Sequence, residues 1–296
     1  MTILIICLFY HLFFKIDHFK TEKGRFATFL CQAGFIFSII DMRKMKGAEQ
    51  MITLSDCSCW FTDKKKVVKA VKHMTFSVNE GEVVGILGEN GAGKTTLLRT
   101  IATLLQPNHG TVNVAGFDTV KEATEVKKRI GVLFGGETGL YDRLTARENL
   151  EYFGKLYGLD QHEIKARIED LAKRFGMREY MDRKVKGFSR GMKQKVAIAR
   201  TLIHDPDIIL FDEPTTGLDI TSSNIFRDFI KQLKQQNKTI LFSSHIMEEV
   251  SLLCDSVMMI HQGELVYKGT LPELYAQEQS EDLNYIFMSK LARGIS

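Results

Sequence analysis

The sequence centres on Gly88-Glu89-Asn90-Gly91-Ala92-Gly93-Lys94-Thr95. This stretch fits the pattern G-x-x-x-x-G-K-[ST] of a phosphate-binding loop, the Walker A motif. The apolar run at residues 82–87 predicts a buried strand before the loop, and residues 96–101 begin a helical pattern after it. Because strand and helix flank the glycines in the order that the motif requires, we interpret the stretch as a polyphosphate-binding loop rather than a glycine-rich turn.

The residue types of this loop suit a polyphosphate and its divalent cation. Glycines allow the backbone to curl, so that successive N–H groups point inward at the phosphates. The N-terminus of the following helix adds partial positive charge. Lys94 can reach the β- and γ-phosphates, and the hydroxyl of Thr95 can ligate Mg²⁺.

A second segment, residues 207–213, predicts a buried strand that ends in two carboxylates, Asp212 and Glu213. Acids at the C-terminal end of a strand lie at the ligand edge of a parallel sheet, beside the phosphate loop. Asp212 is suited to hold Mg²⁺ through the water shell of the ion. Glu213 is suited to orient and deprotonate an attacking water. His245 follows a strand at 239–242, where it can sense the γ-phosphate; without this context it would be an ordinary surface histidine.

Composition and charge indicate an ordinary globular protein of one or two domains. The 296 residues are 44% hydrophobic and 26% charged, and the formal net charge is +4. Residues 1–50 hold 7 basic and 4 acidic residues, which leaves 33 basic and 32 acidic residues in the rest of the chain. This nearly neutral body gives no electrostatic footprint for DNA or RNA, so we expect no nucleic-acid partner.

The five cysteines have no spacing that predicts a disulfide framework or a complete zinc site. Cys57-x-Cys59 lacks a second pair of ligands, so we expect two reduced thiols on a strand. A reducing cytosol fits this cysteine usage.

Residues 1–50 differ from the rest of the chain, because residues 2–14 and 26–40 are nearly all apolar. Each run is short for a membrane span of about 20 residues. Three interpretations compete: a membrane hairpin or anchor, a buried helical pair, or a segment that is not native, with translation starting at Met51. We favour the third, because a globular domain begins cleanly at Met51.

From Met51 onward, strands and helices alternate. Residues 51–56 and 67–78 predict strands separated by a basic turn at 62–66, and either Trp60 or Phe61 could stack on a nucleobase or pack in the core. Helices at 145–157 and 163–175 predict a small subdomain inserted between core strands. Further strands are predicted at 110–114, 130–134, 239–242, 256–261 and 264–268, and further helices at 119–128, 190–203 with Ser189 as N-cap, 221–235, 246–254 and from 272 onward.

The segment Phe188-Ser189-Arg190-Gly191-Met192-Lys193-Gln194-Lys195 resembles the L-S-G-G-Q signature of ABC-type ATPases. Thr216-Gly217-Leu218-Asp219 resembles the D-loop of that family, and His245 its switch histidine. With the phosphate loop and Asp212-Glu213-Pro214, five motifs occur in the family's order between residue 51 and about 274. The resemblance implies an α/β fold: a P-loop NTPase (RecA-like) core with an antiparallel β subdomain and an inserted α-helical signature subdomain, over residues 51–275, followed by a helical tail at 276–296.

The same resemblance implies an ATPase that uses ATP and Mg²⁺ and works in pairs. Two subunits, identical or different, would sandwich two ATP molecules, and the helix start at Ser189–Gly191 of one would face the phosphate loop of the other. Alignment with the family places Phe61, rather than Trp60, at the adenine-stacking position. The nucleotide contacts implied are Phe61, Gly88, Asn90, Gly91, Gly93, Lys94, Thr95, Thr96, Ser189, Gly191 and Asp219; the Mg²⁺ contacts are Thr95 and Asp212; and the catalytic residues are Lys94, Glu213 and His245.

This sequence departs from the family pattern at three positions. Arg190 replaces the first glycine of the signature and Met192 replaces its glutamine, although Ser189 is kept. Gly135 stands where ABC subunits usually carry a glutamine that approaches Mg²⁺ and the attacking water. A glycine cannot ligate, so we expect Glu137 or water to substitute, or the site to depend on the two acids at 212 and 213.

Residues 133–144, 211–224 and 243–250 resemble the ATPase subunit of Nat-type sodium-exporting ABC transporters. We therefore expect a subunit on the cytoplasmic face of the cell membrane that binds an integral membrane permease and powers sodium efflux. The alternative is a multidrug or antibiotic exporter. A non-transport ABC ATPase of translation or DNA maintenance is disfavoured, because the chain has one cassette and no coiled-coil insertion. A nucleotide-binding protein without turnover is disfavoured by the presence of all the catalytic residues.

Overall fold

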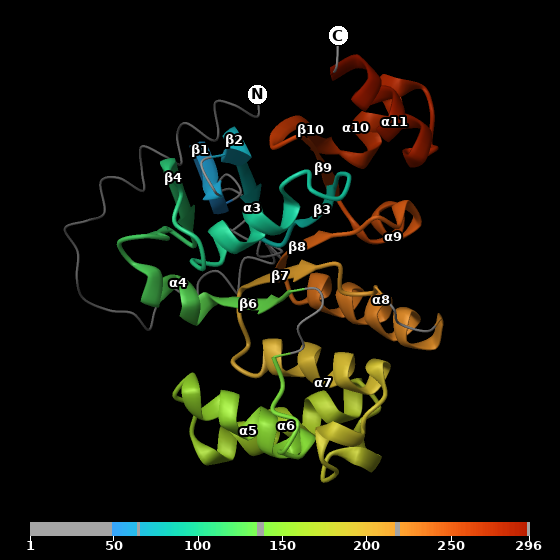
Figure 1. The fold of residues 1–296 in the computed structure, drawn as a ribbon. Helices are drawn as coiled ribbons and strands as arrows, with labels where there is room; N and C mark the ends of the chain where they lie inside the picture. Colours follow the sequence, from blue (N-terminus) through green and yellow to red (C-terminus); the bar gives the residue numbers. More distant parts are fainter. Residues whose placement is uncertain (1–48, 64–65, 135–138, 217–219, 295–296) are drawn as a thin grey trace, which may run out of the picture. The chain divides into compact units, whose positions relative to one another are not determined.

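A six-stranded mixed sheet carries the phosphate loop (Figure 1). Neighbouring strands run in parallel except at one edge, where the last two strands form an antiparallel pair. The strands are β3 (Val83–Leu87), β6 (Ile130–Leu133), β7 (Ile208–Asp212), β8 (Thr239–Ser243), β9 (Ser256–His261) and β10 (Glu264–Thr270), in the spatial order β10-β9-β3-β8-β7-β6. β8 therefore lies between the strand before the phosphate loop and the strand that ends in Asp212.

The structure is a computed structural model that describes residues 49–63, 66–134, 139–216 and 220–294. The contacts within the chain group residues 48–296 together. The apolar runs at 2–14 and 26–40 lie outside the described residues, so the three interpretations of residues 1–50 stay predictions.

Alternate residues of the parallel strands face two different cores, because both faces of the sheet are covered. In β3, Val84 and Ile86 join one hydrophobic cluster, whereas Val83 and Leu87 join the other. β7 and β8 follow the same alternation. This two-sided burial is why these strands occur as continuous apolar runs in the sequence.

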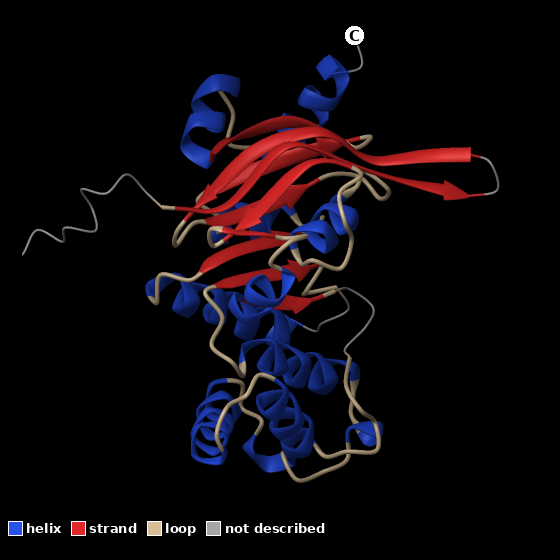
Figure 2. Ribbon diagram, turned by 90° about the vertical axis from the view of Figure 1, so that its left-hand side faces the viewer, coloured by secondary structure: helices blue, strands red, loops and turns tan. Residues whose placement is uncertain are grey.

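The first helix after the phosphate loop, α3 (Lys94–Ile101), lies between the mixed sheet and a four-stranded antiparallel sheet. Leu97, Leu98 and Ile101 share one cluster with inward residues of both sheets. The antiparallel strands are β1 (Gln50–Asp63), β2 (Lys66–Asn79), β4 (His109–Val114) and β5 (Phe117–Asp118), in the order β2-β1-β4-β5, and the β1–β2 hairpin extends beyond the rest of that sheet (Figure 2).

Two predicted elements differ from the observed bounds by more than two residues at one end. The strand predicted at 51–56 continues as β1 to Asp63, because its pairing with β2 runs the length of the hairpin. The helix predicted at 119–128 is α4 (Ala123–Arg129). The Asp118 carboxylate accepts the N–H groups of Val120 and Lys121 at 2.9 Å each, which holds these residues in a turn and delays the helix.

A helical subdomain is inserted between β6 and β7, as predicted, and lies below the mixed sheet in Figure 1. The capping box of Thr145 and Glu148 is present, and the Ser189 side chain accepts the N–H of Met192, as an N-cap does. A second capping box, Asp160 with Glu163, was not predicted. The subdomain contains α5 (Ala146–Leu156), α6 (Gln161–Arg174), the short helices η2 (Arg178–Tyr180) and η3 (Val185–Gly187), and α7 (Arg190–Leu202). Together with the two sheets, it confirms the predicted fold class.

The C-terminal helices pack on the core rather than away from it. Ile286 and Phe287 of the last helix are buried in the hydrophobic cluster that also holds the inner faces of the helical subdomain. These helices are α8 (Ile220–Gln235), α9 (Met247–Leu253), α10 (Leu271–Glu278) and α11 (Leu283–Gly294). Within the described ranges, no helix combines the length and apolar character needed to cross a bilayer. Cys57, Cys59 and Cys254 are free and buried.

His204 fastens the helical subdomain to the core. Its ring stacks on Tyr157 with 3.6 Å between centroids and 4° between planes, and its Nε2 lies 3.0 Å from the Ile130 carbonyl oxygen. Burial lowers the pKa of His204 to about 4, from an ordinary value of 6.5. The folded state therefore favours the neutral ring.

We expect acid to destabilise the protein through this histidine. The unfolded chain takes up the proton below pH 6.5, whereas the folded state resists it down to about pH 4. The free energy of unfolding therefore decreases as the pH falls below 6.5, by about 2 kcal/mol between pH 7 and pH 5. Urea unfolding at both pH values should show this loss in the wild type, and a smaller loss in His204→Gln, whose amide can keep the bond to Ile130. His162→Gln, on the exposed face of α6, should behave as the wild type; equal losses in all three proteins would contradict the assignment.

Candidate active site

The phosphate loop, residues 88–93, joins β3 to α3 and passes close to two other backbones. Gly91 and Gly93 have φ angles of +82° and +109°, which favour glycine. A Cβ at Gly93 would lie 2.2 Å from the Ala70 carbonyl oxygen of β2, and one at Gly88 would lie 2.5 Å from that of Ile260. Side chains at these positions would displace the loop, so the glycines are needed for its shape.

Lys94 is nearly buried, with 6% of its surface exposed, at the start of α3. Its Nζ donates to the carbonyl oxygens of Gly88 at 2.6 Å and Glu89 at 3.1 Å. Burial lowers the pKa of Lys94, and the charges of Glu213 and Asp212 act in the opposite direction. Asn90 and Thr96 lie on either side of this lysine, in the loop and in the first turn of α3. A buried ammonium held by carbonyl groups within an anion-binding loop fits a polyphosphate ligand.

Three oxygen-bearing side chains meet where β7, β8 and α3 come together. The Thr95 hydroxyl donates to Asp212 Oδ2 at 2.7 Å, and the Ser243 hydroxyl donates to Asp212 Oδ1 at 2.6 Å. Asp212 and Ser243 are paired neighbours in the sheet. Hydroxyl and carboxylate oxygens are the ligands that Mg²⁺ prefers. Among the described residues, no group of three His, Cys, Asp or Glu side chains could hold a metal alone, so Mg²⁺ here would need phosphate or water oxygens as well.

Glu213 and His245 stand beside this cluster. His245 Nδ1 lies 3.8 Å from Glu213 Oε2, and the histidine side chain is 57% exposed. The Glu213 backbone is left-handed, with φ of +48°, which is unusual for a residue with a side chain. Its N–H donates to the Ser243 hydroxyl at 2.9 Å, which holds this conformation in place. The structure therefore brings together the two residues that the sequence suggested separately.

The signature residues Ser189 and Gly191 begin α7, which packs on the opposite face of the mixed sheet from α3. Arg190, a departure from the family signature, donates to the Thr216 carbonyl oxygen at 2.9 Å, and Gln194 donates to that of Pro214 at 2.7 Å. Both contacts tie the signature helix to the turn that follows Glu213.

The two aromatic candidates of β1 point to different places. Phe61 is 43% exposed and pairs with Val68, two residues from the point where β2 touches the phosphate loop at Ala70. Trp60 instead lines a separate hollow with His73 and His109. The exposed ring of Phe61 leaves its adenine-stacking role a prediction.

Several expected residues fall outside the described ranges, namely Gly135, Glu137 and Asp219. Ser243 is the contact that sequence reasoning missed. Its signal was weak but present: a serine at the C-terminal end of a buried strand, next to the strand that ends in Asp212.

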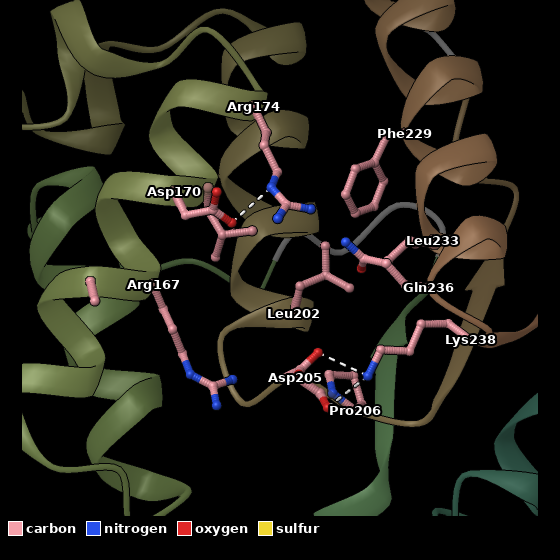
Figure 3. A pocket seen from close by; sticks show the side chains of 12 residues that line it. Arg167, Asp170, Arg174, Leu202, Asp205, Pro206, Phe229, Leu233, Gln236 and Lys238 are labelled. Atoms are coloured by element: carbon pink, nitrogen blue, oxygen red, sulfur yellow. Dashed lines mark hydrogen bonds and ion pairs between the residues drawn. The ribbon is translucent and has the colours of Figure 1, made fainter. Parts of the chain in front are cut away.

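A cavity of about 530 Å³ lies between α6 and α8, away from the phosphate loop (Figure 3). Its charged side chains largely neutralise each other: Arg174 Nε lies 2.7 Å from Asp170 Oδ2, and Lys238 Nζ lies 2.8 Å from Asp205 Oδ1. Leu202, Phe229 and Leu233 also line this cavity. None of the residues proposed for nucleotide contact lines it, so it is not the candidate active site.

Comparisons with known proteins give a consistent result. The family model described as "ABC transporter" matches residues 71–216. The chain is 76% identical over 246 residues to the ABC transporter ATP-binding protein NatA of Bacillus subtilis (strain 168), a match that covers 83% of this chain and 100% of that protein. It is 40% identical over 211 residues to the linearmycin resistance ATP-binding protein LnrL of the same strain, covering 71% of this chain and 67% of that protein. A solved dimeric ATP-binding cassette in a post-hydrolysis state, bound to ADP and Pi, matches with a TM-score of 0.69 and 27% identity, covering 74% of this chain and 98% of that chain.

Replacing Gly93 with alanine is expected to weaken nucleotide binding about tenfold or more. The left-handed conformation costs an alanine about 1–2 kcal/mol, and its Cβ would collide with the Ala70 carbonyl oxygen. Calorimetric titration with ADP, which is not hydrolysed, measures the change. Gly116→Ala is the control, because Gly116 has φ of +83° but no neighbour within 4 Å of its Cβ. Equal ADP affinities of the two variants would contradict the need for close approach at Gly93.

Proposed function

The chain belongs to the ABC transporter family of ATP-binding proteins, and from this premise we propose that it is the ATP-hydrolysing subunit of a membrane exporter that removes sodium from the cell. The observation that carries the ATP-hydrolysing role is the convergence of Lys94, Thr95, Asp212, Glu213 and His245 at one edge of the mixed sheet. ATPase activity itself follows from family membership. The roles of individual residues, the transported ion and the partners are our proposals.

The loop binds the triphosphate through backbone N–H groups, and Lys94 turns from the loop carbonyls to the β- and γ-phosphate oxygens. Phe61 stacks on the adenine from the β1–β2 hairpin. Thr95 and Asp212 would hold Mg²⁺, which supplies charge neutralisation at the phosphate oxygens when bound. Ser243 keeps Asp212 in place by donating to the carboxylate oxygen that Thr95 does not use.

Glu213 acts on the attacking water. As the water oxygen bonds to the γ-phosphorus, Glu213 accepts a water proton, and the bond from the γ-phosphorus to its bridging oxygen breaks to leave ADP. His245, 3.8 Å from Glu213, is placed to donate a hydrogen bond to a γ-phosphate oxygen and so report whether that phosphate is present. The Glu213 backbone is left-handed, and its Oε2 accepts a hydrogen bond from the Thr216 hydroxyl at 3.3 Å.

A second ATPase subunit, identical or different, completes the site. Ser189 and Gly191 begin a helix on the other face of the sheet, so they serve the phosphate loop of a partner rather than their own. The similar cassette that was solved as a dimer supports this arrangement. An integral membrane permease is the other partner, which places this subunit at the cytoplasmic face of the membrane.

Two observations bear on the transported substrate. The 76% identity to NatA, together with the resemblance of residues 133–144 to Nat-type sodium exporters, supports sodium. The 40% identity to a linearmycin resistance protein supports the alternative, an exporter of antibiotics. The Nat-type resemblance favours sodium, and the higher identity to NatA than to LnrL agrees with that subfamily.

Glu213→Gln should retain ATP binding but hydrolyse ATP at least about a hundredfold more slowly, because the amide cannot accept the water proton. Phosphate release measures the rate, and size-exclusion chromatography with ATP should show trapped dimers. Glu179→Gln, an exposed residue of η2, should keep the wild-type rate. Full turnover of Glu213→Gln would show that another group is the base.

Inside-out vesicles that contain the chain and its permease should accumulate sodium when ATP is added outside, since export from the cell corresponds to uptake by such vesicles. Sodium-sensitive fluorescence measures the uptake, and vesicles carrying Glu213→Gln are the control. Sodium uptake that is unchanged by ATP would exclude sodium as the substrate, while ATP-driven uptake of linearmycin would favour the antibiotic exporter.

A further inference from the structure

We propose that Glu249 of α9 is a positioning residue for ATP hydrolysis. Its buried carboxylate joins the turn that carries Glu213 to the loop that carries His245, and so sets the distance between these two side chains. The inference rests on the proposed roles of Glu213 and His245 and extends them to a residue that touches neither the nucleotide nor the water.

Glu249 is an acid in an unusual place, because only 1% of its surface is exposed. Its Oε2 accepts hydrogen bonds from the Thr215 hydroxyl at 2.9 Å and from the Ser244 hydroxyl at 3.2 Å. Arg227 of α8 lies 3.9 Å from the other carboxylate oxygen and provides a compensating charge. A buried carboxylate is costly unless it is paired and hydrogen-bonded, so this one needs both hydroxyls to stay where they are.

The Thr215 contact fixes the turn after β7. Thr215 follows Glu213 by two residues, and this turn holds Glu213 in its left-handed conformation. The Thr216 N–H donates to the Glu213 carbonyl oxygen at 3.2 Å, and Gln194 holds Pro214 from α7. A strained backbone persists only when its surroundings determine it from several sides. Glu249 holds the turn from the direction of α9, through its bond to the Thr215 hydroxyl.

The Ser244 contact fixes the loop after β8. The Ser244 hydroxyl donates to Glu249 and accepts the N–H of Ile246 at 3.0 Å, so it closes a tight turn around His245. The N–H of Glu249 in turn donates to the Ile246 carbonyl oxygen at 3.1 Å. The buried carboxylate of Glu249 therefore fixes the backbone that carries the exposed imidazole of His245.

One oxygen atom of Glu249 thus bonds to both chain segments, the turn after β7 that carries Glu213 and the loop after β8 that carries His245. If this oxygen is removed, each segment can move independently of the other. A displacement of about 1 Å at a reacting group can cost on the order of a hundredfold in rate, whereas most of the proposed nucleotide contacts, on the phosphate loop and at Phe61, lie on other segments than the two that Glu249 holds. The expected signature is therefore a loss in kcat without a loss in ATP affinity.

Steady-state ATP hydrolysis by the complete chain tests the proposal. Glu249→Leu, which keeps the side-chain volume but removes the oxygen, should lower kcat at least about tenfold with the KM for ATP changed less than about twofold. Glu249→Gln should restore most of kcat, because its amide oxygen can accept both hydroxyls. Glu248→Leu is the matched control: its side chain is 80% exposed one residue away on the same helix and lies 4.0 Å from the same Arg227, so the variant removes a charge beside Arg227 but keeps the acceptor of Thr215 and Ser244. An equal kcat for Glu248→Leu and Glu249→Leu would overturn the proposal.

A second pair of variants keeps the test decisive where Glu249→Leu does not fold. Thr215→Val removes one donor without changing shape and should lower kcat, while Thr215→Ser keeps the hydroxyl and should not. If Thr215→Val keeps the wild-type kcat, or if kcat, ATP affinity and melting temperature all fall together, Glu249 has no positioning role. Glu213→Gln assayed in parallel separates the failure of the proposed function from the failure of this inference. Full turnover of Glu213→Gln would show that Glu213 is not the base. An inactive Glu213→Gln beside a fully active Glu249→Leu would contradict only the positioning role of Glu249.

Discussion

The hydrogen-bonded contact of Thr95, Asp212 and Ser243 depends on one constraint, the parallel register of β3, β8 and β7. Because β3, β8 and β7 run in parallel, with β8 in the middle, their C-terminal ends lie at the same edge of the sheet. Asp212 can then accept one hydroxyl from the helix after β3 and another from its own neighbour on β8. Parallel strands require crossover connections, so this edge is assembled from segments that are far apart in the chain.

Burial on both faces of the sheet keeps that register. A slip of one residue would exchange the two sets of side chains, Val84 and Ile86 against Val83 and Leu87, between cores of different shape. On one face, α3 is held between two sheets, which fixes the helix start that carries Lys94 and Thr95. On the other face, the helical subdomain and α11 share a single cluster. The position of the phosphate loop therefore follows from packing on both sides of the strands beneath it.

The turn after β7 concentrates strain and the contacts that support it. Glu213 adopts a left-handed backbone, and the turn is supported from three elements: by Ser243 of β8, by Arg190 and Gln194 of α7, and by Glu249 of α9. In this chain the departure at Arg190 is not merely tolerated, since its guanidinium bonds the backbone of the same turn. The start of α7, the proposed switch His245 and the proposed base Glu213 are thus connected by hydrogen bonds within one subunit.

The sequence alone determined what short-range chemistry encodes: the strand–loop–helix around Lys94, the capping box at Thr145, the N-cap at Ser189 and the two acids at the end of β7. These are set by neighbours within a few residues, so their patterns can be recognised locally. Local patterns predicted the wrong helix start after Asp118, because its carboxylate bonds the N–H groups that would begin the helix, and the wrong strand end, because pairing with β2 extends β1 to Asp63. Only the tertiary structure decided that Ser243 bonds Asp212, 31 residues away, and that Glu249 bonds Thr215, 34 residues away. Such contacts depend on strand order and register, which no local pattern specifies, because they arise only when separate buried surfaces are packed together.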